Sequence, residues 1–114
     1  MKIVNRVKAS DDFAKVIKKG KACRTNSFTI HFLKTDNQFT RVGVSVSNKI
    51  GNAVIRNRLK RQIRAMSDDL IKYDLNSFDI IIIARKEILN FSFQENKLQL
   101  SNLLYTQVGL LNEK

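Results

Sequence analysis

The middle of the chain carries a dense set of arginines and lysines whose chemistry suits phosphate groups. Between residues 37 and 67 there are seven basic side chains and no acidic one. The seven are Arg41, Lys49, Arg56, Arg58, Lys60, Arg61 and Arg64. The planar guanidinium group of arginine makes two parallel hydrogen bonds to a phosphate and can also stack on a base. The stretch therefore predicts a surface for a polyanion, with nucleic acid as the first candidate.

Most of these cations fall on one side of a predicted helix from about Asn52 to Leu70. At 3.6 residues per turn, five apolar side chains form a narrow stripe that must face a core. The stripe consists of Ile55, Leu59, Ile63, Met66 and Leu70. The adjacent arc carries Arg56, Asn57, Lys60, Arg61 and Arg64, and Arg58 lies on the far flank. From Arg56 to Arg61 no acidic residue stands three or four positions away, so the cations repel one another until an anion binds.

Other interpretations of the same residues remain open at this point. A solvated cationic helix face without a partner is the plainest alternative, although the arginine bias and Gly51-Asn52 at the helix start favour nucleic acid. A small ribosomal protein would share the composition. A DNA-binding regulator would need a second helix joined closely to the first, and strands flank this one. A nuclease made of protein alone would need clustered carboxylates or histidines, and we find no catalytic or metal-binding constellation in the sequence.

Composition limits the class of protein further. The chain has 114 residues, which predicts a single domain over residues 1–114, and its net charge is +11 with a pI near 10.2. No apolar run reaches the roughly 18 residues that a membrane span needs. The basic N-terminus runs into Asp11 and Asp12, which is not typical of a signal peptide. A lone cysteine, Cys23, agrees with a reducing compartment, so we expect a cytoplasmic protein without a membrane partner.

The remaining elements predict an α+β two-layer sandwich, with helices on one face of a small mixed sheet. Strand-like runs at Ser27–Lys34 and Arg41–Val46 flank a turn and are interpreted as a hairpin. The run Asp79–Ala84, which is wholly apolar after its first residue, is typical of a strand buried on both faces. Helices are expected from about Asp11 to Lys19 and, after a capping box at Ser92 and Glu95, to about Leu111. With a short extra strand at Ala22–Arg24, the order is α-β-β-(β)-α-β-α.

The segment from Arg41 to Arg64, RVGVSVSNKIGNAVIRNRLKRQIR, resembles the signature of the bacterial ribonuclease P protein subunit. The likeness continues at Asp12-Phe13, at Lys18–Gly20 and at Asp79–Lys86, so it covers nearly the whole chain. The resemblance implies a left-handed β-α-β crossover. It also implies a partner, the ribonuclease P RNA, which cleaves the 5′ leader from precursor tRNA with Mg²⁺. In such an assembly the protein has no catalytic residue of its own, is inactive alone and is not expected to bind DNA.

The resemblance also assigns roles to individual positions. Those expected to face the catalytic RNA are Lys49, Asn52, Arg56, Asn57, Arg58, Lys60, Arg61 and Arg64. Those expected in a cleft for the 5′ leader, between the first helix and the sheet, are Phe13, Ile17, Phe28 and His31. Ile17 and His31 stand where many relatives are expected to have an aromatic residue, which predicts less base stacking here. Asn48 stands where lysine is common.

Overall fold

The computed structural model describes residues 1–2, 5–7 and 10–111. Its main elements are α1 (Ser10–Lys19), β1 (Lys21–Arg24), β2 (Phe28–Lys34), β3 (Arg41–Ser45), α2 (Ala53–Leu70), β4 (Phe78–Ala84) and α3 (Phe93–Asn102). Short helical turns follow α2, β4 and α3, namely η2 (Tyr73–Leu75), η3 (Lys86–Asn90) and η4 (Leu103–Val108). The α+β class, the order of elements and the short strand β1 are confirmed. Among the described residues, no helix is long and apolar enough to cross a membrane.

The strands form one mixed sheet in the order β1-β2-β4-β3. The strand β4 pairs antiparallel with β2 and parallel with β3, so β3, α2 and β4 make a β-α-β crossover. The predicted hairpin between β2 and β3 is wrong because β4 lies between them. A strand made almost wholly of isoleucine has no solvent-facing side, and the centre of the sheet is where it loses the most contact with water. The handedness of the crossover stays a prediction.

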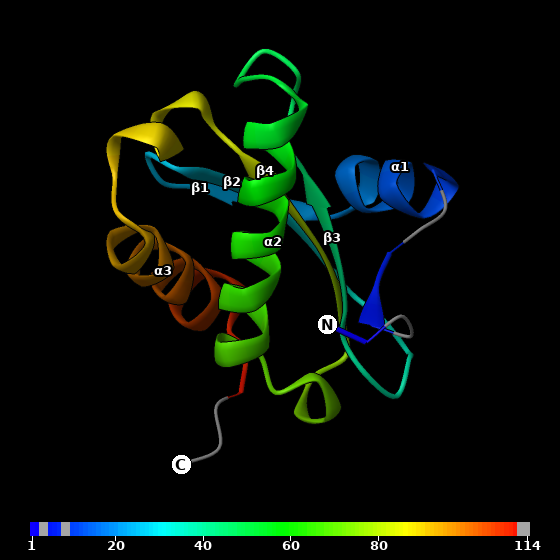
Figure 1. The fold of residues 1–114 in the computed structure, drawn as a ribbon. Coiled ribbons are helices and arrows are strands. Elements are labelled where there is room, and N and C mark those ends of the chain that lie inside the picture. Colours follow the sequence, from blue (N-terminus) through cyan, green and yellow to red (C-terminus); the bar gives the residue numbers. More distant parts are fainter. Residues whose placement is uncertain (3–4, 8–9, 112–114) are drawn as a thin grey trace.

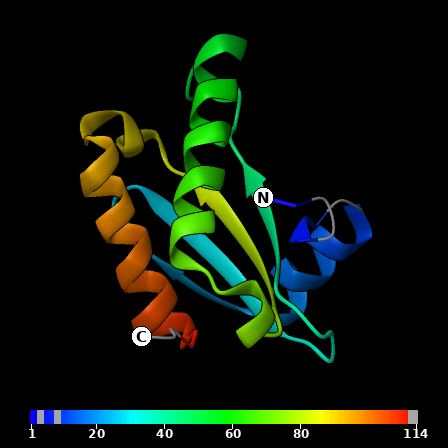
Figure 2. The same ribbon diagram turned by 60° about the horizontal axis from the view of Figure 1, so that its bottom comes forward.

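Helices cover both faces of this sheet (Figures 1 and 2). Alternate residues of β4 point to opposite faces: Ile80 and Ile82 lie in the main core, and Ile81 lies in a smaller cluster with Val16 of α1. The main core is closed by α2 and α3, and the smaller cluster by α1. The expectation of helices on one face is therefore correct for α2 and α3 only, since an apolar strand needs cover on both sides.

The helix ends follow from specific caps. The Asn52 side chain accepts a hydrogen bond from the Ile55 amide at 3.0 Å and starts α2. The predicted capping box is confirmed, because the Ser92 amide donates to Glu95 at 2.9 Å and the Glu95 amide donates to the Ser92 hydroxyl at 3.1 Å.

The last helical run ends earlier than predicted. The run α3 continues into the wider turn η4, which ends at Val108 rather than near Leu111. The next residue, Gly109, has φ +82° and its amide donates to the Leu104 carbonyl at 3.0 Å. Glycine adopts this left-handed conformation without steric cost, so it stops the helix.

Candidate nucleic-acid interface

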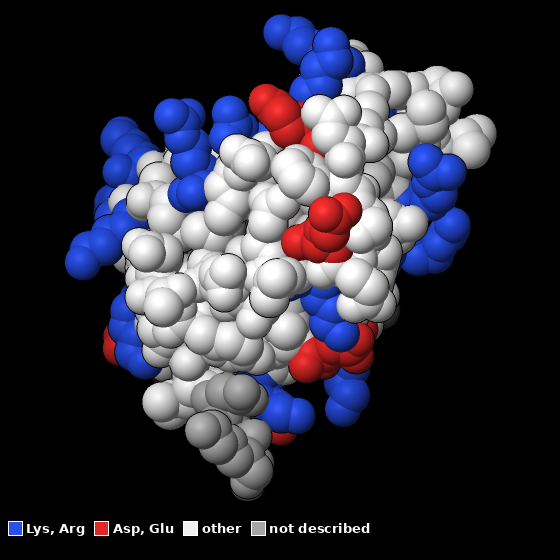
Figure 3. Space-filling view, turned by 90° about the vertical axis from the view of Figure 1, so that its left-hand side faces the viewer, with Lys and Arg blue, Asp and Glu red and all other residues white. Residues whose placement is uncertain are grey.

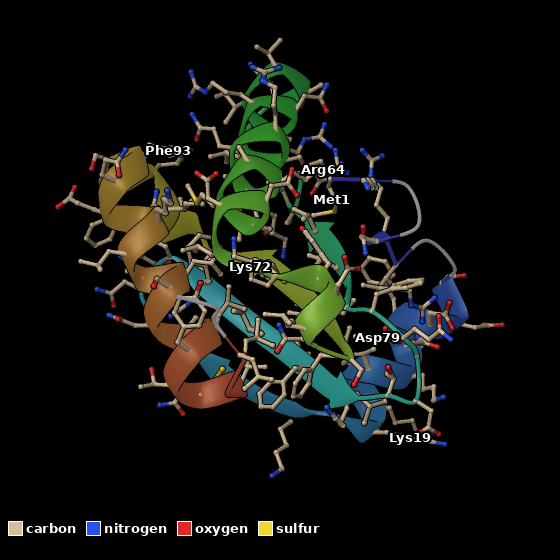
Figure 4. All side chains as sticks on the ribbon, turned by 90° about the horizontal axis from the view of Figure 1, so that it is seen from below. Met1, Lys19, Arg64, Lys72, Asp79 and Phe93 are labelled. Atoms are coloured by element: carbon tan, nitrogen blue, oxygen red, sulfur yellow. The ribbon has the colours of Figure 1, made fainter. Side chains whose placement is uncertain are left out.

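The rotation of α2 about its own axis is fixed by its apolar stripe. Leu59, Ile63 and Met66 are buried in the main core, and Ile55 and Leu70 pack half-buried against it. This confirms the stripe expected from helical spacing. The opposite side of α2 must therefore face away from the sheet, and Figure 4 shows side chains with terminal nitrogens gathered there, toward the N-terminal end of the helix.

The eight positions expected to face RNA lie on α2 or shortly before it, and we call them the α2 surface. Its members are Lys49, Asn52, Arg56, Asn57, Arg58, Lys60, Arg61 and Arg64. Arg58 lies on the flank toward Phe93 of α3, whereas Asn57, Arg61 and Arg64 line the other flank. Arg56, Lys60 and Arg64 are half-buried and the other five are exposed. Among the ion pairs between described residues, none includes a cation of the α2 surface. These charges are held in place by the fold without being neutralised by it.

Two members of the α2 surface also hold the start of the helix. The Arg56 Nε donates to the Gly51 carbonyl at 3.2 Å, which orients its guanidinium group beside the first turn. The Asn52 oxygen is used by the cap, so the NH₂ of its amide is the group left for a ligand. The helix start thus presents hydrogen-bond donors to an anion, beside the positive end of the helix dipole.

A groove of about 500 Å³ lies between the outer side of α2 and the N-terminal segment. Arg6 lines it together with Lys60, Arg61 and Arg64, and Figure 4 places Arg64 near Met1. The segment is held there because the Val7 amide donates to the Val42 carbonyl at 3.0 Å. Sequence spacing gave no signal for Arg6, since it is far from α2 in the chain and is brought there by β3.

The one acidic side chain in the wall of this groove, among the described residues, is already engaged. Asp68 accepts from the N-terminal ammonium group at 2.5 Å and from the Tyr73 hydroxyl at 2.9 Å. Burial, followed by the hydrogen bond to Asp68, raises the pKa of Tyr73, so this hydroxyl stays protonated at neutral pH. The groove therefore remains positive.

Arg41 is a basic residue of the acid-free stretch that does not join the α2 surface. Its Nε and Nη2 donate to the two oxygens of Asp79 at 3.0 and 2.6 Å, and its Nη1 lies 3.4 Å from Asp12. The hydrogen bond to Asp79, more than any other contact, raises the pKa of Arg41. This arginine ties β3, β4 and α1 together, and its charge is compensated inside the protein.

Three of the four residues expected in the leader cleft lie on the α1 side of the sheet. Phe13 packs over Gly43, where an added Cβ would come within 2.6 Å of its ring. Ile17 is 46% exposed, and His31 is half-buried on the side of β2 that faces α1. Phe28 is different: it is fully buried in the main core, on the opposite face. Phe28 and His31 are three positions apart in one strand, so their side chains point to opposite faces.

The metal-binding and thiol side chains of the described residues form no reactive site. Among the described residues, no group of three His, Cys, Asp or Glu side chains is placed to hold a metal ion. Cys23 is half-buried, and burial raises the pKa of its thiol, which keeps it protonated and weakly reactive.

On the face that lies at the left in Figure 1, acidic side chains occur near the middle, a broad area is uncharged, and basic ones lie mostly at the margins (Figure 3).

The fold and this surface define a small α+β protein with a cationic helix on its outside. The family model for ribonuclease P matches residues 1–107. The ribonuclease P protein component of Mesoplasma florum is 41% identical over 105 residues, which cover 91% of this chain and 96% of the relative. That of Bacillus velezensis is 47% identical over 105 residues, which cover 90% and 89%.

Solved structures agree with these relatives. The RNase P protein of Staphylococcus aureus, at 2.0 Å, superposes with a TM-score of 0.84 and 30% identity, over 94% of this chain and 98% of that one. The RNase P protein of Thermotoga maritima gives a TM-score of 0.75 and 31% identity, over 87% and 94%. The chain belongs to the ribonuclease P protein family, the protein component of a tRNA-processing ribonucleoprotein. The comparisons give no support to the alternative of a small ribosomal protein.

Proposed function

We propose that this chain binds the ribonuclease P RNA through the α2 surface and assists removal of the 5′ leader from precursor tRNA. The observation that carries the proposal is the set of α2 cations without an ion-pair partner among the described residues. Each RNA phosphate that such a cation neutralises releases counterions. Contacts to the RNA backbone should therefore contribute most of the binding free energy. Phosphate contacts also fix the register of the protein on its RNA.

The leader would lie on the α1 side of the sheet, against Phe13, Ile17 and His31. Phe13 offers an aromatic edge, Ile17 an exposed apolar group and His31 a hydrogen-bonding ring. Phe28 is left out of this contact because it is fully buried on the other face. With one aromatic group in place of several, we expect contacts to the leader backbone to outweigh base stacking.

The division of labour follows from the chemistry of the α2 surface. Its groups are positively charged nitrogens and two amides, whereas Mg²⁺ is held by carboxylates, phosphates and water. The residues present therefore do not fit a resident magnesium ion, and we assign both the Mg²⁺ ions and the hydrolysis to the RNA. The protein alone is expected to be inactive, and to act in the cytoplasm, where we expect the precursor tRNA to be processed.

The test is cleavage of precursor tRNA by a bacterial ribonuclease P RNA at low Mg²⁺, with and without this protein. Strong stimulation by the protein, together with no cleavage by the protein alone, is the expected result. The double variant Arg56→Glu/Arg58→Glu should lose the stimulation, and the equally charged control Lys15→Glu/Lys72→Glu, whose lysines are exposed outside α2, should keep it. Tight RNA binding without stimulation would contradict the proposal.

A further inference from the structure

A second basic pocket lies away from the α2 surface and from the α1 side groups. It has a volume of about 380 Å³ and is formed where α1 meets β1, where β2 ends and β4 begins, and by η4. Its main lining residues are Lys19, Lys21, Lys34, Phe32, Phe78 and Gln107. None of them belongs to the surfaces described above, and Figure 4 shows Lys19 far from Arg64 of α2.

Close packing of Gly20 against β2 positions the backbone of the two lysines beside it. Between Lys19 and Lys21, the Gly20 amide donates to the Val16 carbonyl at 2.9 Å. An added Cβ on Gly20 would lie 2.3 Å from the Phe32 carbonyl oxygen, so only glycine allows this approach of the chain to β2. The backbone of the two lysines is thereby fixed on either side of Gly20 at the end of the sheet, and their side chains are exposed.

An aromatic wall completes the pocket. The rings of Phe32 and Phe78 pack edge to face, with centroids 6.3 Å apart, and both are half-buried. The Lys34 ammonium group lies 4.9 Å from the centre of the Phe78 ring. A cation–π contact holds an ammonium group in place without cancelling its charge. The ammonium group of Lys34 is therefore held next to the Phe78 ring and keeps its charge.

The charges of this pocket have no anion within the protein. None of Lys19, Lys21 and Lys34 takes part in an ion pair among the described residues, and no acidic residue is among those that line the pocket. Three ammonium groups around one opening favour a phosphate, and the ring edges favour a planar apolar group beside it. A nucleotide carries both groups in one molecule.

We propose that this pocket binds one nucleotide of a single-stranded RNA segment. Its phosphate lies among the lysines, its base lies against Phe32 and Phe78, and the Gln107 amide is available to the base edge. The choice of RNA over other phosphate compounds rests on the function proposed above. The site gives the protein a second contact with RNA, separate from the α2 surface. A single-stranded segment could therefore bind along a longer part of the protein surface.

The test is an NMR titration of the whole protein with adenosine monophosphate and with a six-nucleotide oligoadenylate. Both ligands should shift the backbone amides of Lys21, Phe32 and Gln107, with tighter binding of the oligonucleotide. In Lys21→Glu/Lys34→Glu these shifts should disappear and oligonucleotide affinity should fall at least threefold. The salt slope of binding should fall by about 0.7, since the pocket holds one phosphate and a single strand gives about 0.7 per phosphate contact.

Controls separate this site from the α2 surface. Arg56→Glu/Arg58→Glu should leave the shifts at Lys21, Phe32 and Gln107 in place, even if it abolishes stimulation of precursor-tRNA cleavage. Lys15→Glu/Lys72→Glu should match the wild type, and thermal melting should confirm that all variants fold. The proposal is overturned if neither ligand shifts the amides of the pocket. Shifts with the mononucleotide but not with the oligonucleotide would overturn the assignment to RNA.

Discussion

Arginines from one acid-free stretch of sequence end in two opposite environments. Arg41, at the start of β3, makes two hydrogen bonds to Asp79, a residue 38 positions away that β4 brings beside it. Arg58, on α2, is exposed and has no acidic partner among the described residues. A basic residue without acidic neighbours in the sequence can thus still have an acidic neighbour in the folded structure. The fold neutralises the arginine of the edge strand β3 and leaves those on α2 charged.

Repulsion between the charges on α2 destabilises the helix much less than burial of its apolar side chains stabilises it. Like charges such as Arg56 and Lys60, one turn apart, destabilise a helix by a few tenths of a kcal/mol per pair. Burial of Leu59, Ile63 and Met66 contributes roughly 1.5–3 kcal/mol for each side chain. The protein can therefore keep α2 folded without RNA, and the surface is formed in advance of binding.

Removing the acid of the Arg41–Asp79 pair should produce the largest effect. Asp79→Ala leaves the Arg41 guanidinium half-buried without its main partner, and the Asp79 side chain itself is only 7% exposed. We expect a loss of roughly 3 kcal/mol in the free energy of unfolding, measured by urea denaturation. RNA affinity should be unchanged while the protein is folded.

A matched exposed pair provides the control for this prediction. Asp69 pairs with Lys97 at 2.9 Å but its side chain is 63% exposed. Asp69→Ala should therefore cost no more than about 1 kcal/mol. Equal losses from Asp69→Ala and Asp79→Ala would mean that the Arg41–Asp79 pair contributes no more stability than an exposed ion pair.

Truncating one arginine in each environment sharpens the contrast. Arg58→Ala should weaken binding to ribonuclease P RNA about fivefold and lower the salt slope by about one, as expected for a phosphate contact. Its unfolding free energy should stay within about 0.5 kcal/mol of the wild type. Arg41→Ala should do the reverse, with lower stability and an unchanged slope. A normal salt slope for Arg58→Ala would remove Arg58 from the interface.

Asn52 has both a structural role and an expected binding role, because it caps α2 and belongs to the α2 surface. Asn52→Ala should cost about 1 kcal/mol of stability through the lost cap, and Asn52→Ser, which restores a cap, should recover most of it. Calorimetry checks both variants. Lower RNA affinity for both, despite the recovered stability, would show that the Asn52 amide contacts RNA directly.

The smallest effect concerns the capping box of α3, far from the α2 surface. Hydrogen bonds from the Ser92 amide and hydroxyl lower the pKa of Glu95. A carboxyl with a lowered pKa in the folded state stabilises the protein above its unfolded pKa, near 4.3, and loses that contribution as the pH falls through the folded value. The stability difference between wild type and Glu95→Gln should therefore shrink from pH 6 to pH 3. A constant difference would contradict this.

Local signals in the sequence were enough for the elements and for the buried side of α2. The spacing of Ile63 and Met66 with their neighbours gave the buried side of α2, and the spacing of Ser92 and Glu95 gave the start of α3. These features depend on residues a few positions apart. The position of Phe28 could also have been found locally, since strand alternation places it opposite His31.

Long-range pairing could not be found in this way. The insertion of β4 between β2 and β3 decides which strands are neighbours, and turn residues near Thr35 favoured the wrong hairpin. The same insertion brings Asp79 to Arg41, and the pairing of the N-terminal segment with β3 brings Arg6 to α2. Each depends on contacts between residues more than thirty positions apart, which no local pattern records.

The central claim is that the protein binds RNA through the cations of α2 that have no acidic partner within the fold. The direct measurement is the affinity for ribonuclease P RNA, over a range of salt, of Arg56→Glu/Arg58→Glu against Lys15→Glu/Lys72→Glu. Both variants change the net charge by the same amount. We predict at least a thirtyfold loss and a shallower salt slope for the α2 variant, near-normal binding for the control, and nearly equal melting temperatures. Equal losses in the two variants would mean that net charge alone drives binding and would contradict the account.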